Sequence, residues 1–416
     1  MDRRDFLTGS ATSLGLLAAS ELLAPRAASA TPDARAPSAA ASSDGSESGV
    51  ALQELRDVLG QLEASFATDA WSLRGPLDQA EARRLVMFHL HHAIEVYFEP
   101  SPERPAWKRF VTPEKKLLGD NPDAIYYATP VSFAHSYRIR GNTAGAIYTS
   151  FTVEVGGPGG GNPTGLGATL NDSEFEIAPD GSYEIVACAE KPERGNWLRL
   201  DANANSLSTR HYYENASSIA ADQLHHIPLA IDRLDLTAPP PPPSEASVSA
   251  GIRRVANFLR SSVSPPRRDP ALLPPWVSLV PNQFPRPKKD DSNTKVGFAA
   301  KDNVYSMAPF VLAPDETLVI RGRFPKCRFA NVVLWNRHTH TLDYRYRQIS
   351  LNRKQTKLEA DGSFKIVLAA RDPGVSNWLD TEGRPSGSVF WRFQLPEEEI
   401  APLDSKLVKL ADVKSA

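Results

Sequence analysis

The stretch that decides the fold is residues 180–186, DGSYEIV, because the chain repeats it at residues 361–367 as DGSFKIV, 181 positions later. Two further pairs of short motifs keep this offset, namely Arg140-Gly141 with Arg321-Gly322 and Asn196-Trp197-Leu198 with Asn377-Trp378-Leu379. Chance does not preserve one spacing across separated motifs. The sequence therefore contains two copies of one structural unit.

Both copies have the pattern of short β-strands punctuated by turns. Residues 147–155 alternate apolar and polar side chains, which is the period of two of a half-buried strand. Each DGS motif predicts a turn before a strand, at 183–189 in the first copy and at 364–369 in the second. Further strands are expected at 136–140, 318–323, 331–337, 344–351 and 389–395. We therefore predict a mainly β protein with two tandem antiparallel β-sandwich modules of the jelly-roll kind.

Helix is expected in two places outside the repeat. Residues 52–97 carry apolar side chains at helical spacing, and a second amphipathic stretch follows the prolines at 239–243, with Ser244 as its N-cap. We expect this second helix to brace the two modules against each other.

The predicted divisions are a signal peptide (1–30), a disordered linker (31–49), a helical N-terminal segment (50–110), the first module (111–238), a proline-rich hinge with the bracing helix (239–296), the second module (297–397) and a C-terminal tail (398–416).

The first thirty residues resemble a twin-arginine signal peptide. The arginines at 3–4 precede Phe6-Leu7, a weakly apolar stretch follows, and the small residues at 28–30 form a cleavage site. The apolar stretch is diluted by small polar residues and Glu21, so it is a poor membrane anchor. The sequence thus predicts export of the folded protein by the twin-arginine machinery, a periplasmic or secreted location, and no integral membrane segment.

Composition excludes several classes of function. The chain has 416 residues with 47 basic and 49 acidic side chains, so it lacks the basic excess of a nucleic-acid binder. It contains neither a G-x-S-x-G motif nor a C-x-x-C motif, so a serine nucleophile or a zinc site of this kind is unsupported. Cys188 and Cys327 are expected to be small buried apolar residues, with a disulfide as the alternative.

Four motifs carry a resemblance to a known bacterial family. They are GDNPDAIYY at 119–127, YRIRG at 137–141, NWLD at 377–380 and FWRF at 390–393. These motifs are similar to those of the family described as domain of unknown function 1214, and the resemblance covers residues from about 110 to 397. It implies β-sandwich modules in a secreted or periplasmic protein. It implies no agreed activity and no catalytic residues.

The densest polar and aromatic stretch is WNRHTHTLDYRYRQ at residues 335–348. If this stretch crosses a strand end, His338 and His340 project from the same face, because strand side chains alternate. With Asp343 nearby, the two histidines could be ligands of one divalent metal. The alternative is a solvated hairpin with scattered histidines.

Aromatic and arginine side chains suggest a ligand site in the second module. Flat rings and fixed donors orient polar ligands in clefts, and the expected substrate contacts are Trp335, Tyr344, Tyr346, Arg384 and Trp391. The expected catalytic residues are Asp172, Asp343 and Arg347, although glycoside cleavage would need two carboxyl groups about 5 to 10 Å apart. Trp197 and Trp378 occupy matched repeat positions and are expected to be core residues.

Two function classes follow from these patterns. The first is a hydrolase or lyase that acts on a glycan or another polar envelope substance in a cleft between the modules. The second is a non-catalytic ligand-binding or envelope-organising protein that uses the same aromatic surface. Both take a small molecule or a glycan as ligand, and the sequence does not choose between them.

Overall fold

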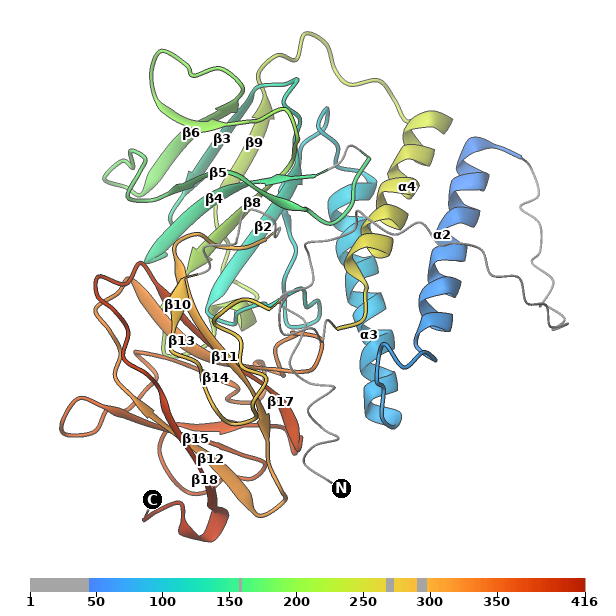
Figure 1. Cartoon of the computed structure of the whole chain (residues 1–416). Coiled ribbons are helices and arrows are strands. Elements are labelled where there is room, and N and C mark those ends of the chain that lie inside the picture. The colour runs from blue at the N-terminus through green and yellow to red at the C-terminus, as the bar shows by residue number, and fades with distance from the viewer. Residues whose placement is uncertain (1–44, 157–158, 267–272, 290–297, 416) are drawn as a thin grey trace, which may run out of the picture.

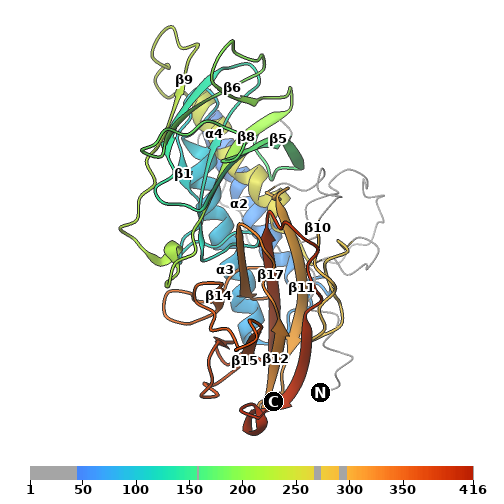
Figure 2. The same cartoon turned by 90° about the vertical axis from the view of Figure 1, so that its left-hand side faces the viewer.

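Two β modules lie end to end, and three helices form a layer along one side of the pair (Figures 1 and 2). The structure is a computed structural model that describes residues 45–156, 159–266, 273–289 and 298–415. The expected signal peptide at 1–30 lies outside the described residues, as does most of the expected linker at 31–49.

The first module is built from two sheets. A five-stranded antiparallel sheet has the order β1-β2-β8-β4-β5, and a four-stranded sheet has the order β7-β6-β3-β9 with β7 parallel to β6. The strands are β1 (Lys108–Arg109), β2 (Ala124–Pro130), β3 (Tyr137–Asn142), β4 (Tyr148–Val155), β5 (Gly165–Asn171), β6 (Ser182–Cys188), β7 (Asn196–Arg199), β8 (Ala204–Tyr212) and β9 (Leu229–Arg233).

The second module repeats this order strand by strand. Its sheets are β10-β11-β17-β13-β14 and β16-β15-β12-β18, again with one parallel pair, β15 and β16. The strands are β10 (Lys288–Lys289), β11 (Asn303–Val311), β12 (Glu316–Gly322), β13 (Phe329–Trp335), β14 (Ser350–Asn352), β15 (Phe364–Ala369), β16 (Trp378–Asp380), β17 (Ser386–Gln394) and β18 (Asp404–Lys409). The predicted mainly β fold with two tandem modules is confirmed. Strand β18 lies within the expected tail and completes its sheet by pairing with β12.

The repeated DGS motif forms the same turn in both modules. Gly181 and Gly362 have φ values of +82° and +81°, in the left-handed region that glycine adopts at no steric cost. In each copy the serine N–H and hydroxyl donate to the preceding aspartate carboxylate, Asp180 or Asp361. The motif is therefore a hairpin device rather than a site.

The repeated Arg-Gly motif allows an aromatic ring to lie across a strand. Gly141 pairs with Tyr183, and Gly322 pairs with Phe364. A Cβ atom at Gly141 would lie 2.4 Å from the Tyr183 hydroxyl oxygen, and one at Gly322 would lie 2.6 Å from the Phe364 ring. Both contacts are too close for any residue but glycine.

The repeated Asn-Trp-Leu motif attaches the parallel edge strand. The Asn196 amide donates to the carbonyls of Glu176 and Glu184, and Asn377 makes the equivalent bonds to two backbone carbonyls of its module. In the same way, Trp197 and Trp378 each donate an indole N–H to the backbone of the neighbouring strand. Both indoles are partly buried.

The helical layer consists of N-terminal helices joined by the linking helix. Its elements are α2 (Glu47–Ser65), α3 (Pro76–Ala93), the π-helix η1 (Ile94–Phe98) and α4 (Glu245–Ser262). Elsewhere in the described residues lie two 3-10 turns, η2 (Ile219–Ala221) and η5 (Leu410–Asp412). The Ser244 hydroxyl caps α4 as predicted, by accepting the Ser247 N–H. Helix α4 packs against α2, α3 and η1. No helix in the described part of the chain is long and apolar enough to span a membrane.

Two strands differ from their sequence expectation. Strand β4 was expected to be half-buried, but seven of its eight residues are buried. Its second face is covered because Thr152 and Glu154 contact Arg210 and the backbone of Phe298. Of the expected strand at 344–351, only the last residues join β14, because the N–H of Arg347 donates to the carbonyl of Asp343 and closes a turn.

Polar side chains join the two modules. The Tyr148 hydroxyl donates to Asp302 at 2.7 Å, and the Asn331 and Asn352 amides donate to the buried Asp123 carboxylate at 2.9 and 3.0 Å. Burial raises the pKa of Asp123 to about 7. The modules therefore meet through a hydrogen-bonded interface, which includes the GDNPDAIYY motif.

The two cysteines are free thiols that lie in different modules. The Sγ atom of Cys188 donates to the carbonyl of Glu190 at 2.9 Å, and Cys327 donates to the carbonyl of Phe329 at 3.3 Å. Burial raises the pKa of Cys327 to about 11. Neither thiol has the depressed pKa of a reactive nucleophile.

Candidate ligand-binding cleft

A tight turn after β13 brings the two predicted metal-binding histidines together. The Asn336 side-chain oxygen accepts the N–H groups of His338 and His340 at 2.9 and 3.1 Å, and Thr339 has a φ of +55°. The two imidazole centroids lie 6.5 Å apart. They are neighbours because of this turn, and not because of the strand alternation that the sequence suggested.

Both histidines are buried beneath helix α3. His89 of α3 lies 6.0 Å from His340 between ring centroids, and the Nε2 atoms of His89, His338 and His340 have no hydrogen-bond partner among the described residues. Burial lowers the pKa of His89 and His338 to about 3 and that of His340 well below its usual value. All three imidazoles are therefore neutral at pH 7.

Metal binding by these histidines has no further support. In the part of the chain that the structure describes, no three His, Cys, Asp or Glu side chains are grouped so as to hold a metal ion. The charged groups that act on His338 and His340 are the cations Arg337, Lys116 and Arg84, which would repel a metal ion. Metal binding by His338 and His340 stays a prediction.

A cleft of about 610 Å³ lies between α3 and the second module, and we call it the α3 cleft. Its lining comes from α3, from the chain before β2 and from two loops of the second module. The lining residues are Glu81, Arg84, Phe88, Pro113, Glu114, Lys116, Asn336, His340, Thr341, Leu342, Asp343, Arg345, Tyr346, Arg347, Glu382 and Arg384. The volume is in the range of small-molecule sites.

Most charges of the α3 cleft are paired across its wall. Arg384 lies between Glu81 and Glu382, at 2.6 and 3.0 Å. Arg345 pairs with Glu114. These pairs join α3 and the chain before β2 to the second module, so they fix the shape of the cleft.

Two further cations of the cleft, Arg84 and Lys116, differ in their partners. Arg84 lies over the Phe88 ring at 4.8 Å and forms no ion pair with any described carboxylate. Lys116 lies 3.5 Å above the Tyr344 ring, donates to the Thr341 hydroxyl at 2.7 Å and is 3.9 Å from Asp120. Burial lowers the pKa of Lys116 to about 8. Arg84 is thus the cation that remains available to a ligand.

Several predicted site residues meet in the α3 cleft. Asp343, Tyr346, Arg347, Arg384 and His340 all line it. Tyr346 is 77% exposed, and Arg347 pairs with a carboxylate behind it, Asp380, at 2.7 Å. The N–H of Asp343 donates to Glu382 at 2.6 Å.

Other predicted site residues lie in the core or elsewhere. Trp335 and Trp391 are fully buried, and they stack on Phe390 and Phe364 with centroids 4.2 and 5.2 Å apart. Tyr344 is buried under Lys116, and His338 is buried under α3 and does not line the cleft. These four side chains are buried and present no face to a molecule bound in the cleft.

Asp172 lies at the junction of the modules. Its carboxylate accepts the Thr149 N–H at 2.9 Å and is 3.3 Å from Arg328 of the second module. It is absent from the lining of the α3 cleft. The structure therefore does not bring Asp172 together with Asp343 and Arg347.

No local pattern in the sequence marks the residues that α3 contributes to the cleft. Glu81 and Arg84 occupy an ordinary polar pattern on a helix, and Arg384, the partner of Glu81, lies some 300 residues later in the chain. The sequence around Glu382 likewise contains no motif that predicts a site residue. Only the packing of α3 against the second module shows that these residues share a site.

The fold and the cleft define a class of protein with two tandem β modules, a helical layer and a polar cleft. Residues 312–398 match the family described as protein of unknown function DUF1214. The crystal structure of an uncharacterised protein from Burkholderia cenocepacia is 30% identical to this chain, with a TM-score of 0.73, and the match covers 88% of this chain and 98% of that one. Residues 312–398 of the second module are therefore a DUF1214 domain, and the chain as a whole is similar to the uncharacterised Burkholderia protein.

Another solved structure resembles the chain more weakly. The VPA0106 protein from Vibrio parahaemolyticus is 12% identical, with a TM-score of 0.42, over 78% of this chain and 98% of that one. No curated protein matches the chain.

Proposed function

We propose that this protein is an exported cell-envelope protein that binds an anionic polar ligand, such as an acidic glycan fragment, in the α3 cleft without chemical turnover. One observation carries the proposal. Residues from distant parts of the chain converge on one cleft of about 610 Å³, in which Arg84 has no carboxylate partner among the described residues. A cation held at a cleft wall favours a ligand of the opposite charge.

The α3 cleft offers the contacts that a sugar-like anion needs. Tyr346 presents an exposed ring, and Arg345 and Arg347 flank it in the sequence. Flat rings and guanidinium donors are the groups that orient a polar ligand. The cleft therefore combines one free charge with an aromatic surface.

The carboxylates of the cleft favour binding over catalysis. Glu81 and Glu382 are held by Arg384, and Glu114 is held by Arg345. The Asp343 carboxylate accepts the N–H of Arg345 at 3.1 Å. A general acid or nucleophile must reach its substrate, whereas these carboxylates are held by ion pairs and hydrogen bonds to neighbouring residues.

Export is supported by the sequence of residues 1–30 alone. The paired arginines, the weakly apolar stretch and the small residues before Thr31 occur in the order of a twin-arginine signal. A periplasmic or secreted protein would meet acidic glycans in the envelope. The proposed ligand class and the proposed location thus agree.

The test is calorimetric titration of acidic and neutral oligosaccharides into the full mature protein. We expect binding of an acidic oligosaccharide that Arg84→Gln weakens at least tenfold. Arg83→Gln is the matched control, because Arg83 is the adjacent residue of α3 and pairs with Glu63 of α2. Equal affinity in wild type and Arg84→Gln would contradict the proposal.

Hydrolysis or lyase cleavage is the second candidate, favoured by the adjacency of Asp343 and Glu382 in the cleft. The same titration mixtures decide between the two, through analysis of the oligosaccharide for shorter products. Product formation that Asp343→Asn abolishes would replace the binding proposal by an enzyme. Unchanged oligosaccharide after prolonged incubation is the result that we expect.

A further inference from the structure

The two modules place the same pair of residues at the same point of the same sheet. In the first module, Tyr126 of β2 lies directly opposite Arg210 of β8. In the second module, Tyr305 of β11 lies directly opposite Arg392 of β17. Residues directly opposite in an antiparallel pair share one face of the sheet. The repeat has therefore duplicated a tyrosine–arginine pair.

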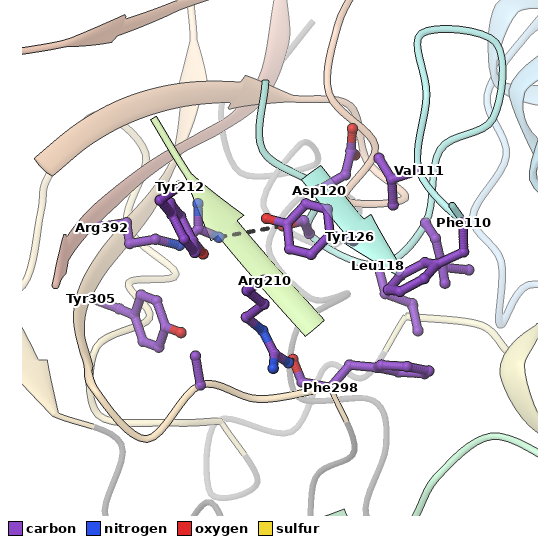
Figure 3. A pocket seen from close by; sticks show the side chains of 13 residues that line it. Phe110, Val111, Leu118, Asp120, Tyr126, Arg210, Tyr212, Phe298, Tyr305 and Arg392 are labelled. Carbon is purple, nitrogen blue, oxygen red and sulfur yellow. Dashed lines mark hydrogen bonds between the residues drawn. The ribbon is translucent and has the colours of Figure 1, made fainter. Parts of the chain in front are cut away.

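Both pairs line one pocket between the modules, which we call the inter-module pocket. Figure 3 shows the two guanidinium groups with the rings of Tyr126, Tyr212 and Tyr305 gathered around them. The pocket has a volume of about 50 Å³. The rest of its lining is Phe110, Val111, Leu117, Leu118, Gly119, Asp120, Phe298 and Ala300.

Arg210 has its hydrogen-bonding capacity filled by protein groups. Its Nη1 donates to the Thr152 hydroxyl at 2.9 Å, and its Nη2 donates to the carbonyls of Phe298 and Ala299 at 2.9 and 3.0 Å. The buried carboxylate of Glu154 lies 3.9 Å away and balances the charge. Arg210 is thus a structural residue.

Arg392 has aromatic partners in place of anionic ones, because its guanidinium lies 5.0 Å from the centroid of the Phe390 ring and 5.9 Å from those of Tyr212 and Tyr305. It is only 5% exposed, and its Nε and Nη1 atoms are buried without a hydrogen-bond partner in the described chain. Among the described residues it donates one long hydrogen bond, of 3.4 Å, from Nη2 to the Gly119 carbonyl, drawn as the dashed line in Figure 3. Unlike Arg210, it forms no ion pair with a described carboxylate. A buried cation without an anionic partner is costly, and its unsatisfied donors fit an anionic ligand.

We propose that the inter-module pocket binds a small monocarboxylate, with Arg392 as its counter-ion. The planar donors of a guanidinium match the two oxygens of a carboxylate. The Tyr305 hydroxyl accepts a hydrogen bond from the Asn303 amide at 3.0 Å, so its own proton is free to donate to the ligand. The ligand would thus be held by both modules.

The size and charge of the pocket set the ligand class. A volume of 50 Å³ is room for roughly three to four water molecules. This size suits a carboxylate with a short carbon chain. Asp120 also lines the pocket, where its carboxylate is bound by Thr341. Lys116 lies 3.9 Å from Asp120 and offsets its charge, so Arg392 leaves one positive charge for the ligand. One positive charge balances a monoanion, and a dianion such as phosphate is disfavoured. The site is separate from the α3 cleft and does not depend on the proposed glycan binding.

The test uses the full mature protein and three probes, which are acetate, its neutral analogue acetamide and inorganic phosphate. Binding is followed by NMR of ¹³C-labelled acetate and by the thermal shift at constant ionic strength. We expect saturable acetate binding that acetamide does not compete for and that phosphate competes for poorly. Equal binding of acetate and acetamide would overturn the proposal without any variant being made.

Variants of Arg392 locate the site. Arg392→Gln should weaken acetate binding at least tenfold, and Arg392→Lys should weaken it several-fold, because lysine keeps the charge and loses the planar donors. Arg323→Gln is the control, since Arg323 is exposed and pairs with Asp361 far from the pocket. Acetate affinity that is unchanged in Arg392→Gln would overturn the proposal. The acidic-glycan affinity should be the same in Arg392→Gln and wild type, so the two proposals fail separately.

Discussion

Arg210 and Arg392 hold the same place in the two modules, yet their surroundings differ. Arg210 donates to a hydroxyl and two carbonyls and lies beside the carboxylate of Glu154. Arg392 is equally buried and has two nitrogen atoms without a partner among the described residues. Duplication supplied one residue twice, and only one copy has a complete set of protein partners.

Other duplicated features did not diverge. The amides of Asn196 and Asn377 make the same bonds, and Gly141 and Gly322 both lie under an aromatic ring. Features that keep identical contacts in both modules serve the fold. A feature whose contacts differ between the copies is where a ligand should be sought.

The largest expected effect compares the two arginines by methionine substitution. Arg210→Met should lower the free energy of unfolding by about 3 to 5 kcal/mol, because it leaves the buried Glu154 without its cation. Arg392→Met should leave stability nearly unchanged or raise it, since it removes a buried charge that has no carboxylate partner among the described residues. Urea unfolding of both variants at pH 7 measures the difference. A severe loss in Arg392→Met and a small one in Arg210→Met would contradict the assignment of roles.

The next effect concerns buried histidines, one in each module. Burial lowers the pKa of both His211 and His338 to about 3. In the unfolded chain each imidazole takes up a proton near pH 6.5, and in the folded protein it does not do so until far lower pH. Stability is therefore fully present above pH 6.5, and it falls by about 2 kcal/mol per imidazole between pH 7 and pH 5.

Glutamine variants check this effect. His211→Gln and His338→Gln should each reduce the difference in unfolding free energy between pH 7 and pH 5 by about 2 kcal/mol, whatever their stability at pH 7. We expect the two variants to change the pH dependence by the same amount, because burial lowers the pKa of the imidazole in both modules. A pH dependence identical to that of the wild type in both variants would show that the imidazoles are protonated in the folded state.

The last expected effect is on the shared asparagines. Asn196→Ala and Asn377→Ala each remove three hydrogen bonds to the backbone, and we expect losses of about 1 to 3 kcal/mol in both. Asn377 is the more buried of the two, so its variant should lie at the upper end. Thermal unfolding of the pair measures this. A loss in one module alone would mean that the motif is not an equivalent device in both copies.

The repeat made the architecture accessible from the sequence. A single spacing of 181 residues, shared by turn, glycine and tryptophan motifs, predicted two modules, and each motif proves to be a local structural device. The linking helix was also visible, because Ser244 and the apolar spacing after it are local signals. What local patterns determine could be predicted in this way.

The candidate sites could be predicted only in part. Asp343, Tyr346 and Arg347 are close in sequence and do share the α3 cleft, but Arg84 joins them only through the packing of α3. Trp335 and Trp391 were expected at the ligand, because an exposed and a buried tryptophan look alike in a sequence. In the sequence, Arg392 stands out only as part of the FWRF motif, since the lack of a carboxylate partner is a property of three-dimensional packing.

The most direct test of the difference between the two arginines is a crystal structure of the wild-type protein grown with acetate. We predict a carboxylate in the inter-module pocket with an oxygen within hydrogen-bond distance of Nε or Nη1 of Arg392, and Arg210 bound as before to Thr152 and the backbone. A pocket that holds only water, or an acetate bound to Arg210 instead, would contradict it.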